Sequence, residues 1–241
     1  MPDLAWMTNR PIAHRGLHDG NKLVWENTLA AFRRAIDGDF AIETDVHLSK
    51  DGVAVIFHDS DLKRLTGREG FVRDHTAAEL AAMNIGSTEE KVPTLKQLLT
   101  LISGQVPVII ELKGDIGFDK GLVAAVAKDL NGYDGHAAIM SFDHHLIRQF
   151  EKYAPGISGG LTAEGTSDVD LEAHFSMLAH AISFVSYNVH HLPNRFISFA
   201  RGRLNMSVIT WTVRTGADLA QTYSHADQAT FELFNPNELS S

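Results

Sequence analysis

The chain of 241 residues contains no cysteine. This absence excludes disulfides, thiol nucleophiles, iron–sulfur clusters and thiolate zinc sites. Any metal ion must therefore be held by carboxylate, carbonyl, water or imidazole ligands. Positive charge is also scarce, because 21 Lys and Arg stand against 30 Asp and Glu, for a net charge of −9. This balance argues against nucleic acid or an anionic membrane surface as the main partner.

Long apolar runs are missing as well, and none approaches the roughly 18 residues that a membrane-spanning helix needs. We therefore expect no integral membrane segment. The first residues show no basic region followed by an apolar stretch and a small-residue cleavage site, so we expect no secretory signal and a cytoplasmic location. The length fits a single domain, because α/β barrels often contain about 200–250 residues. The sequence leaves homo-oligomerisation open.

Short apolar runs rich in Val and Ile recur along the chain, separated by amphipathic or Ala-rich stretches. The expected strands are Pro11–His14, Ala41–Val46, Val53–Phe57, Val106–Glu111, Ala137–Ser141, Ile157–Leu161, Ile182–Tyr187, Met206–Trp211 and Ala226–Phe231. The expected helices are Asn27–Asp37, Thr94–Ile102, Phe118–Leu130, Asp143–Tyr153, Asn194–Gly202 and Thr215–Tyr223. This alternation indicates βαβ units and a parallel sheet, and about eight such units predict a TIM (β/α)8 barrel.

One pair of strands breaks the alternation. The four residues 49–52 are too few for a parallel crossover, so the strands on either side of them must be antiparallel. If Asp51 and Gly52 form a two-residue turn, Asp45 pairs with His58 and their Cβ atoms lie about 5 Å apart. Residues 59–93 are too long for one connection and lack a clear barrel strand. We expect them to be a small insertion within one domain spanning residues 1–241.

Charged residues stand at the ends of two expected strands. Glu43 and Asp45 are two positions apart, so both side chains project from the same face of their strand. Glu111 and Lys113 follow a continuous apolar run, which is typical of a strand buried on both faces. Barrel enzymes keep their active sites at the carboxyl ends of the strands. We therefore expect these side chains to meet at one mouth of the barrel.

The first expected strand ends in His14 and Arg15, and the expected hairpin places His58 at the same end of the barrel. Three carboxylates in a dry pocket repel one another unless a cation neutralises them. With oxygen ligands and no thiolate, that cation should be Mg²⁺, Ca²⁺ or Mn²⁺. Arg15 and Lys113 add positive charge, and phosphate is the anion best matched to an Arg fork beside a metal ion.

An ordered set of short motifs carries a resemblance to a known family. The segments are IAHRG, ENT, IETDV, KDG, FHDSDLKRLT, TAAEL, PTL and VIIELK. In this order and near these spacings they resemble glycerophosphodiester phosphodiesterases, densely over about the first 115 residues and more thinly at 140–142 and 209–213. The resemblance implies a single catalytic TIM-barrel domain with one divalent cation, Mg²⁺ or Ca²⁺ with Mn²⁺ as an alternative. It also implies hydrolysis of small glycerophosphodiesters to sn-glycerol 3-phosphate and an alcohol.

The resemblance also assigns roles to individual residues. The metal ligands it implies are Glu43, Asp45 and Glu111. The general acid/base pair is His14 and His58, and the phosphate contacts are Arg15 and Lys113. Glu26 and Asn27 line or brace the substrate site, and Phe142 and Trp211 match aromatic positions near the glycerol moiety. Which histidine acts as base stays open, as does the nucleophile, either water or the neighbouring glycerol hydroxyl.

Two departures from the family pattern affect the far wall of the pocket. Arg214 stands where the family usually has Asn, and residues 229–236 replace the usual Thr-Asp-x-Pro. Two alternative functions follow from the same residues. A lysophospholipase D-type lipid phosphodiesterase needs an apolar mouth, and we expect no exposed aromatic cluster or basic amphipathic helix to supply one. A catalytically inactive barrel that binds phosphorylated ligands should have lost a ligand or a histidine, yet the matched positions are filled.

Overall fold

The computed structural model describes residues 4–238. Eight parallel strands close into a barrel, since β1 pairs with both β2 and β9. The barrel strands are, in order, β1 (Ile12–Ala13), β2 (Ala41–Leu48), β4 (Val108–Leu112), β5 (Ala137–Ser141), β6 (Ser158–Ala163), β7 (Phe184–Asn188), β8 (Ser207–Val213) and β9 (Gln228–Phe231). The predicted TIM barrel is confirmed.

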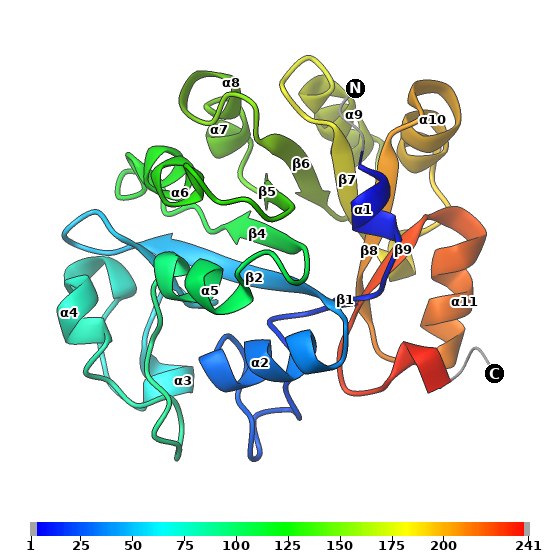
Figure 1. The fold of residues 1–241 in the computed structure, drawn as a ribbon. Coiled ribbons are helices and arrows are strands. Elements are labelled where there is room, and N and C mark those ends of the chain that lie inside the picture. Colours follow the sequence, from blue (N-terminus) through cyan, green and yellow to red (C-terminus); the bar gives the residue numbers. More distant parts are fainter. Residues whose placement is uncertain (1–3, 239–241) are drawn as a thin grey trace.

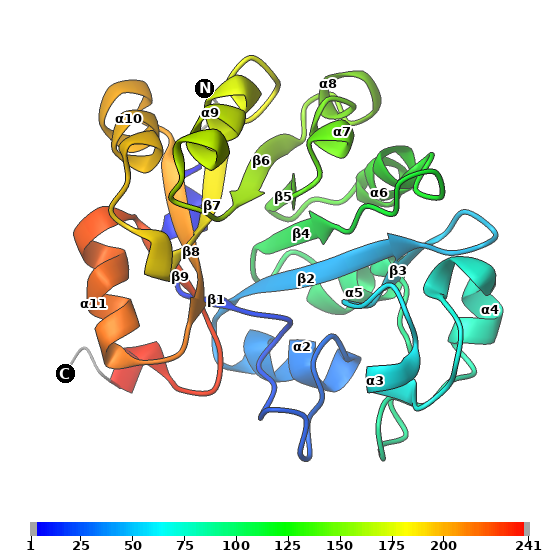
Figure 2. The same cartoon turned by 180° about the vertical axis from the view of Figure 1, so that it is seen from behind.

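Helices surround these strands (Figures 1 and 2). The helices that follow barrel strands are α2 (Leu29–Asp37), α5 (Leu95–Ile102), α6 (Leu122–Leu130), α7 (His144–Ile147), α8 (Phe150–Tyr153), α9 (Asp168–Met177), α10 (Arg195–Leu204) and α11 (Gly216–His225), with 3-10 turns η2 (Val189–His191) and η3 (Pro236–Glu238). The sequence did not predict α9. The single helix expected at 143–153 is two short ones, and α6 begins four residues later than expected.

Local sequence explains where individual helices begin and end. Helix α5 starts at a capping box in which the Thr94 hydroxyl accepts from the Gln97 amide and the Gln97 side chain accepts from Thr94. Such caps stabilise a helix by about 1 kcal/mol. Its apolar residues Leu95, Leu98 and Ile102 are buried against the barrel. The amphipathic period therefore fixes which face of the helix meets the strands.

Two apolar layers hold the barrel together. The larger layer lies between the outer faces of the strands and the surrounding helices. The smaller layer fills the barrel interior, where Ile109 and Ile209 pack with Met7 of the short helix α1 (Ala5–Thr8). Each large apolar side chain buried in this way contributes about 1.5–3 kcal/mol. The packed strands therefore hold the polar residues at their ends in fixed positions.

The β2–β3 hairpin has a different register from the predicted one. Strand β3 (Ala54–Ile56) pairs with β2 so that Val46 lies opposite Ile56, which sets Asp45 against Phe57 rather than His58. The turn contains three residues instead of two, and the left-handed φ of +78° at Gly52 closes it. A three-residue turn that ends in a left-handed glycine adds one residue to the loop and shifts the pairing by one.

Residues 59–93 form the expected insertion beside β2 and β3 (Figures 1 and 2). They contain α3 (Lys63–Thr66), the 3-10 turn η1 (Val72–Asp74) and α4 (Ala77–Leu80). These elements have their own apolar cluster, in which Leu62, Leu65 and Leu80 pack on Val55 and Phe57. Across residues 4–238, no helix combines the length and the apolar character needed to cross a membrane.

Candidate active site

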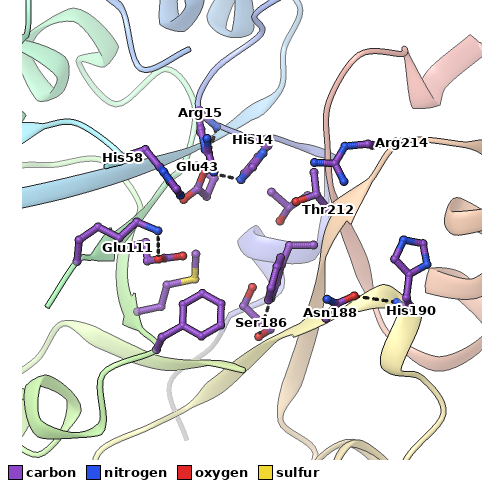
Figure 3. A pocket seen from close by; sticks show the side chains of 15 residues that line it. His14, Arg15, Glu43, His58, Glu111, Ser186, Asn188, His190, Thr212 and Arg214 are labelled. Carbon is purple, nitrogen blue, oxygen red and sulfur yellow. Dashed lines mark hydrogen bonds and ion pairs between the residues drawn. The ribbon is translucent and has the colours of Figure 1, made fainter. Parts of the chain in front are cut away.

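A cavity of about 230 Å³ opens at the carboxyl ends of the barrel strands (Figure 3). It is lined by His14, Arg15, Glu43, His58, Glu111, Lys113, Met140, Phe142, Ser186, Asn188, His190, Trp211, Thr212, Arg214 and Thr230. Of the eleven site residues that the resemblance assigned, eight are among these residues, and so is Arg214. Three others, Glu26, Asn27 and Asp45, lie behind the cavity wall.

Three carboxylates meet at the floor of this cavity, where Glu43 and Glu111 line the surface and Asp45 is buried directly behind them. Glu43 and Asp45 project from β2, and the parallel register places Glu111 of β4 beside Asp45. One oxygen from each of the three lies within 4.8 Å of the others, and all three side chains are buried. The period of two along β2 and the pairing of adjacent parallel strands produce this cluster directly from the sequence.

Two cationic side chains contact the carboxylates. The Lys113 Nζ lies 2.9 Å from the Asp45 Oδ1 and also pairs with Glu111. The Arg15 Nε lies 3.4 Å from the Asp45 Oδ2, and the Arg15 amide donates to the Glu43 Oε2 at 3.0 Å. Arg15 has a φ of +54°, a strained conformation for a residue with a Cβ, and this aims its amide at Glu43.

The pKa values show that these two cations do not neutralise the whole cluster. Burial raises the pKa of Asp45, but the charges of Lys113 and Arg15 outweigh it and hold that pKa well below its usual range. Burial, together with the charges of Asp45 and Glu111, raises the pKa of Glu43 well above normal. Burial also raises the pKa of Glu111. A further positive charge would stabilise all three carboxylates, and an all-oxygen donor set suits a hard divalent cation.

Glu26 and Asn27 brace the residues of the site. The Glu26 carboxylate accepts from Arg15 at 2.7 Å, and its hydrogen bonds to Arg64 overcome burial and lower its pKa to about 2. The Asn27 Nδ2 donates to the Asp45 Oδ2 at 2.8 Å, while its Oδ1 accepts from the Thr44 hydroxyl at 2.9 Å. Both side chains therefore position a residue of the site from behind.

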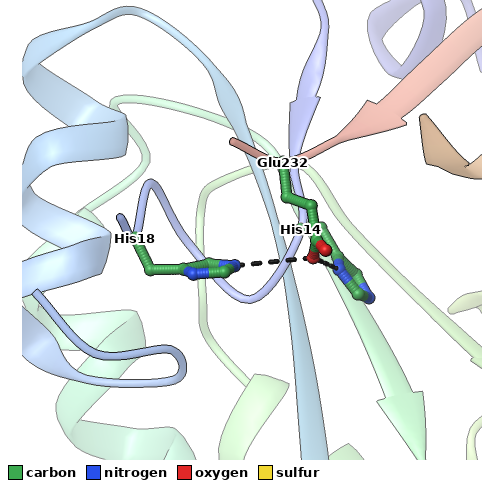
Figure 4. Close-up of side chains that lie close together, drawn as sticks. All are labelled: His14, His18 and Glu232. Atoms are coloured by element: carbon green, nitrogen blue, oxygen red, sulfur yellow. Dashed lines mark hydrogen bonds and ion pairs between the residues drawn. The ribbon is translucent and has the colours of Figure 1, made fainter. Parts of the chain in front are cut away.

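The imidazole of His14 is held by a carboxylate that the sequence did not predict (Figure 4). The Glu232 Oε2 lies 2.5 Å from the His14 Nδ1 and 3.5 Å from the His18 Nε2, and its Oε1 accepts from the Arg214 Nε at 2.7 Å. A carboxylate only accepts, so the His14 proton lies on Nδ1. The His14 Nε2 is then free to exchange a proton, 4.0 Å from the Glu43 Oε2.

The sequence held only a partial signal for Glu232. This residue follows the expected strand at 226–231, and Glu111 likewise comes directly after an apolar run. It lies 218 positions from His14, and only closure of the barrel between β9 and β1 brings the two together.

The second histidine, His58, lines the cavity from the insertion side. Its Nδ1 lies 2.7 Å from the Asp59 Oδ1, and Arg64 donates to Asp59 and to both oxygens of Glu26. Burial lowers the pKa of His58, although the negative charge of Asp45 opposes the shift. Burial likewise lowers the pKa of His14, against the hydrogen bond to Glu232. Both imidazoles are therefore biased toward the neutral form near pH 7.

The opposite wall of the cavity is aromatic. The Phe142 and Trp211 rings pack edge to face with centroids 5.2 Å apart, and the Trp211 indole donates to the Ser186 carbonyl at 3.3 Å. Asn188, His190 and Arg214 line the cavity on the side away from Glu111 and His58 (Figure 3).

The expectation that the surface lacks an exposed aromatic cluster is wrong. Phe71 and Phe118 are 40% and 59% exposed, and Ile116, two positions before Phe118, is 80% exposed. The Arg73 guanidinium lies 4.3 Å from the centroid of each Phe ring. Folding brings Phe71 from the insertion next to the loop after β4, and nothing in the local sequence pattern joins these two stretches.

Comparison with known proteins agrees with this geometry. Residues 14–232 match the Glycerophosphoryl diester phosphodiesterase family. A glycerophosphodiester phosphodiesterase of Caldanaerobacter subterraneus is 38% identical over 162 residues, which cover 62% of this chain and 65% of that protein. The match thus spans about two thirds of that relative's length.

Solved structures show the same fold. An Oleispira antarctica phosphodiesterase, solved with the product sn-glycerol 3-phosphate, superposes with a TM-score of 0.83 at 24% identity, covering 97% of this chain and 96% of that one. A glycerophosphodiester phosphodiesterase from Thermotoga maritima gives a TM-score of 0.73 at 24% identity, covering 92% of this chain and 94% of that one. The match over residues 14–232 shows that this chain belongs to the glycerophosphoryl diester phosphodiesterase family.

Proposed function

We propose that this protein hydrolyses small glycerophosphodiesters to sn-glycerol 3-phosphate and an alcohol, with the help of one divalent cation. The observation that carries the proposal is the cluster of Glu43, Asp45 and Glu111, which shares one cavity with two histidines, Arg15 and Lys113. Family membership and the product bound to the Oleispira protein support the same chemistry.

The three carboxylates would hold the cation. Their oxygens, all within 4.8 Å of one another, suit Mg²⁺ or Ca²⁺, and Mn²⁺ is an alternative with the same preference for oxygen. When bound there, such an ion acts as a Lewis acid toward a phosphate oxygen. Arg15 and Lys113 add fixed positive charge beside it, which stabilises the negative charge that the phosphoryl oxygens gain in the transition state.

The two histidines move the protons. One imidazole takes a proton from the attacking oxygen as that oxygen forms its bond to phosphorus. The other gives a proton to the alcohol oxygen as the bond between that oxygen and phosphorus breaks. Glu232 fixes the His14 ring with Nε2 toward the cavity, and Asp59 fixes the His58 ring through Nδ1. Both rings are thus oriented for transfer through Nε2.

A panel assay tests this function. Glycerophosphocholine, glycerophosphoethanolamine and glycerophosphoglycerol are incubated with the protein in the presence of Mg²⁺, Ca²⁺, Mn²⁺ or EDTA, and glycerol 3-phosphate is measured. We expect release with at least one ion and none with EDTA. Binding of the diesters without turnover would instead support the inactive binding barrel.

Substitution of His14 by Ala tests the role of the imidazole. We expect kcat to fall by at least about 100-fold, the usual scale of general acid–base catalysis. The matched control is His225→Ala, at the end of α11, which runs back from the active-site face toward the opposite end of the barrel. Full activity of the His14→Ala variant would refute the role.

The exposed cluster of Phe71, Ile116 and Phe118 supports a second candidate, a lipid diester such as a lysophospholipid. Ile116 and Phe118 follow Lys113, which lines the cavity, so an apolar chain could lie on these side chains while its phosphate reaches the site. Replacing Ile116 and Phe118 by Ser should slow hydrolysis of lysophosphatidylcholine micelles and spare glycerophosphocholine. Equal effects on both substrates would exclude this candidate.

A further inference from the structure

Arg214 has hydrogen-bonding capacity that the mechanism above does not use. It follows the last residue of β8 and lines the cavity, and its side chain is 52% exposed. Its Nε donates to the Glu232 Oε1 at 2.7 Å. A guanidinium carries five N–H donors, and within residues 4–238 its two terminal nitrogens have no protein hydrogen-bond partner. Four N–H groups are therefore available to a ligand.

The cavity consequently has cationic groups at two separate ends. Arg15 and Lys113 stand at the carboxylate floor, where the phosphate would bind. Figure 3 shows Arg214 on the opposite side of the cavity from Glu111. The paired rings of Phe142 and Trp211 line the same cavity. One phosphodiester carries one negative charge, and Arg15 and Lys113 at the floor already offer positive charge to balance it.

The acidic groups near Arg214 do not neutralise the positive charge at the two terminal nitrogens of its guanidinium. Glu232 is 10% exposed and also serves His14 and His18, so its charge is shared among three donors. Asp218 accepts from the backbone amides of Arg214 and Thr215, which places its charge at the start of α11. His190, 3.7 Å from Asp218, lines the same wall and adds another N–H donor.

We propose that Arg214 is a specificity-determining residue that selects glycerophosphodiesters whose alcohol carries its own anionic group, a carboxylate or a phosphate. This inference rests on the proposed function. An anionic substituent at the far end of the cavity would accept a bidentate pair of hydrogen bonds from the terminal nitrogens. A cationic or neutral alcohol would leave the guanidinium without an anion to bind.

Glycerophosphoserine and glycerophosphoethanolamine test the proposal, because they differ only by one carboxylate. We expect kcat/KM to favour the serine ester by about tenfold, the scale of one partly exposed charge-assisted interaction. Arg214→Gln should reduce this ratio to about one. Because both substrates depend equally on His14, the ratio cancels any loss transmitted through Glu232.

Two further variants sharpen the test. Arg214→Lys keeps one positive charge and should retain part of the preference. Arg203→Gln removes an exposed Arg on the outer helix α10 and should leave the ratio unchanged. A wild-type ratio of one or less, or a ratio that survives Arg214→Gln, overturns this inference alone. If neither diester yields glycerol 3-phosphate, the proposed function fails and the inference fails with it.

Discussion

Replacing Glu232 by Gln removes one negative charge and leaves the shape of the side chain nearly unchanged. Both carboxylate oxygens are acceptors in the structure, Oε2 at 2.5 Å from the His14 Nδ1 and Oε1 at 2.7 Å from the Arg214 Nε. An amide offers only one acceptor oxygen. In either orientation its NH₂ group faces a nitrogen that donates in the native protein.

The expected magnitude follows from the tautomer of His14. If the amide NH₂ faces His14, Nδ1 must become the acceptor and the ring proton moves to Nε2. Nε2 then can no longer accept a proton. The variant should lose the contribution of general acid–base catalysis to the rate, which is about 100-fold to 10,000-fold. We expect Glu232→Gln to lower kcat by at least about 100-fold. For diesters of a neutral alcohol, KM should change little, because Glu232 is not among the residues that line the cavity.

The assay is glycerol 3-phosphate release measured across pH. Burial lowers the pKa of His14 and the bond to Glu232 raises it, while Arg15 lowers it further. Removing the carboxylate leaves burial and Arg15, which lower the pKa of His14, opposed by the charge of Asp45, so the limb of the pH–kcat/KM profile that reports His14 should move to lower pH. Glu232→Asp retains the charge and should recover part of the rate. A kcat within threefold of wild type, with an unmoved limb, would refute this reasoning.

Three other outcomes follow from the structure. His58→Ala should lower kcat by at least about 100-fold while metal affinity is retained, which Mn²⁺ titration would check. Gly160→Ala should destabilise the fold by about 1–3 kcal/mol in urea unfolding, because its Cβ would lie 2.3 Å from the Phe184 ring. Gly202→Ala in α10 meets open space and should be neutral or stabilising by up to about 1 kcal/mol. Unfolding midpoints in the reverse order would contradict this packing argument.

The barrel and the floor of its cavity could be predicted because they depend on local patterns. Alternating strands and helices identify the topology, and the two-residue spacing of Glu43 and Asp45 places both side chains on one face. Parallel neighbours then bring Glu111 beside them. Each of these steps uses only the period of a strand and the order of the chain.

The errors arise where a single residue or a distant contact decides the outcome. The choice of a three-residue turn closed by Gly52 shifted the β2–β3 register by one, and composition alone does not distinguish it from a two-residue turn. Helix α9 was not predicted because its apolar residues recur at every second position from Val169 to Met177, which is the period of a strand rather than of a helix. Glu232 reaches His14 only when β9 closes the barrel against β1.

The central claim is that one divalent cation, held by Glu43, Asp45 and Glu111, is required for phosphodiester hydrolysis. Metal-free protein would be titrated with Mn²⁺ while bound ion is measured by electron paramagnetic resonance and glycerol 3-phosphate release is measured in parallel. We predict that occupancy and activity rise together to one ion per chain, and that Glu43→Gln weakens both. Full activity in the metal-free protein, or saturable Mn²⁺ binding that Glu43→Gln leaves unchanged, would contradict the claim.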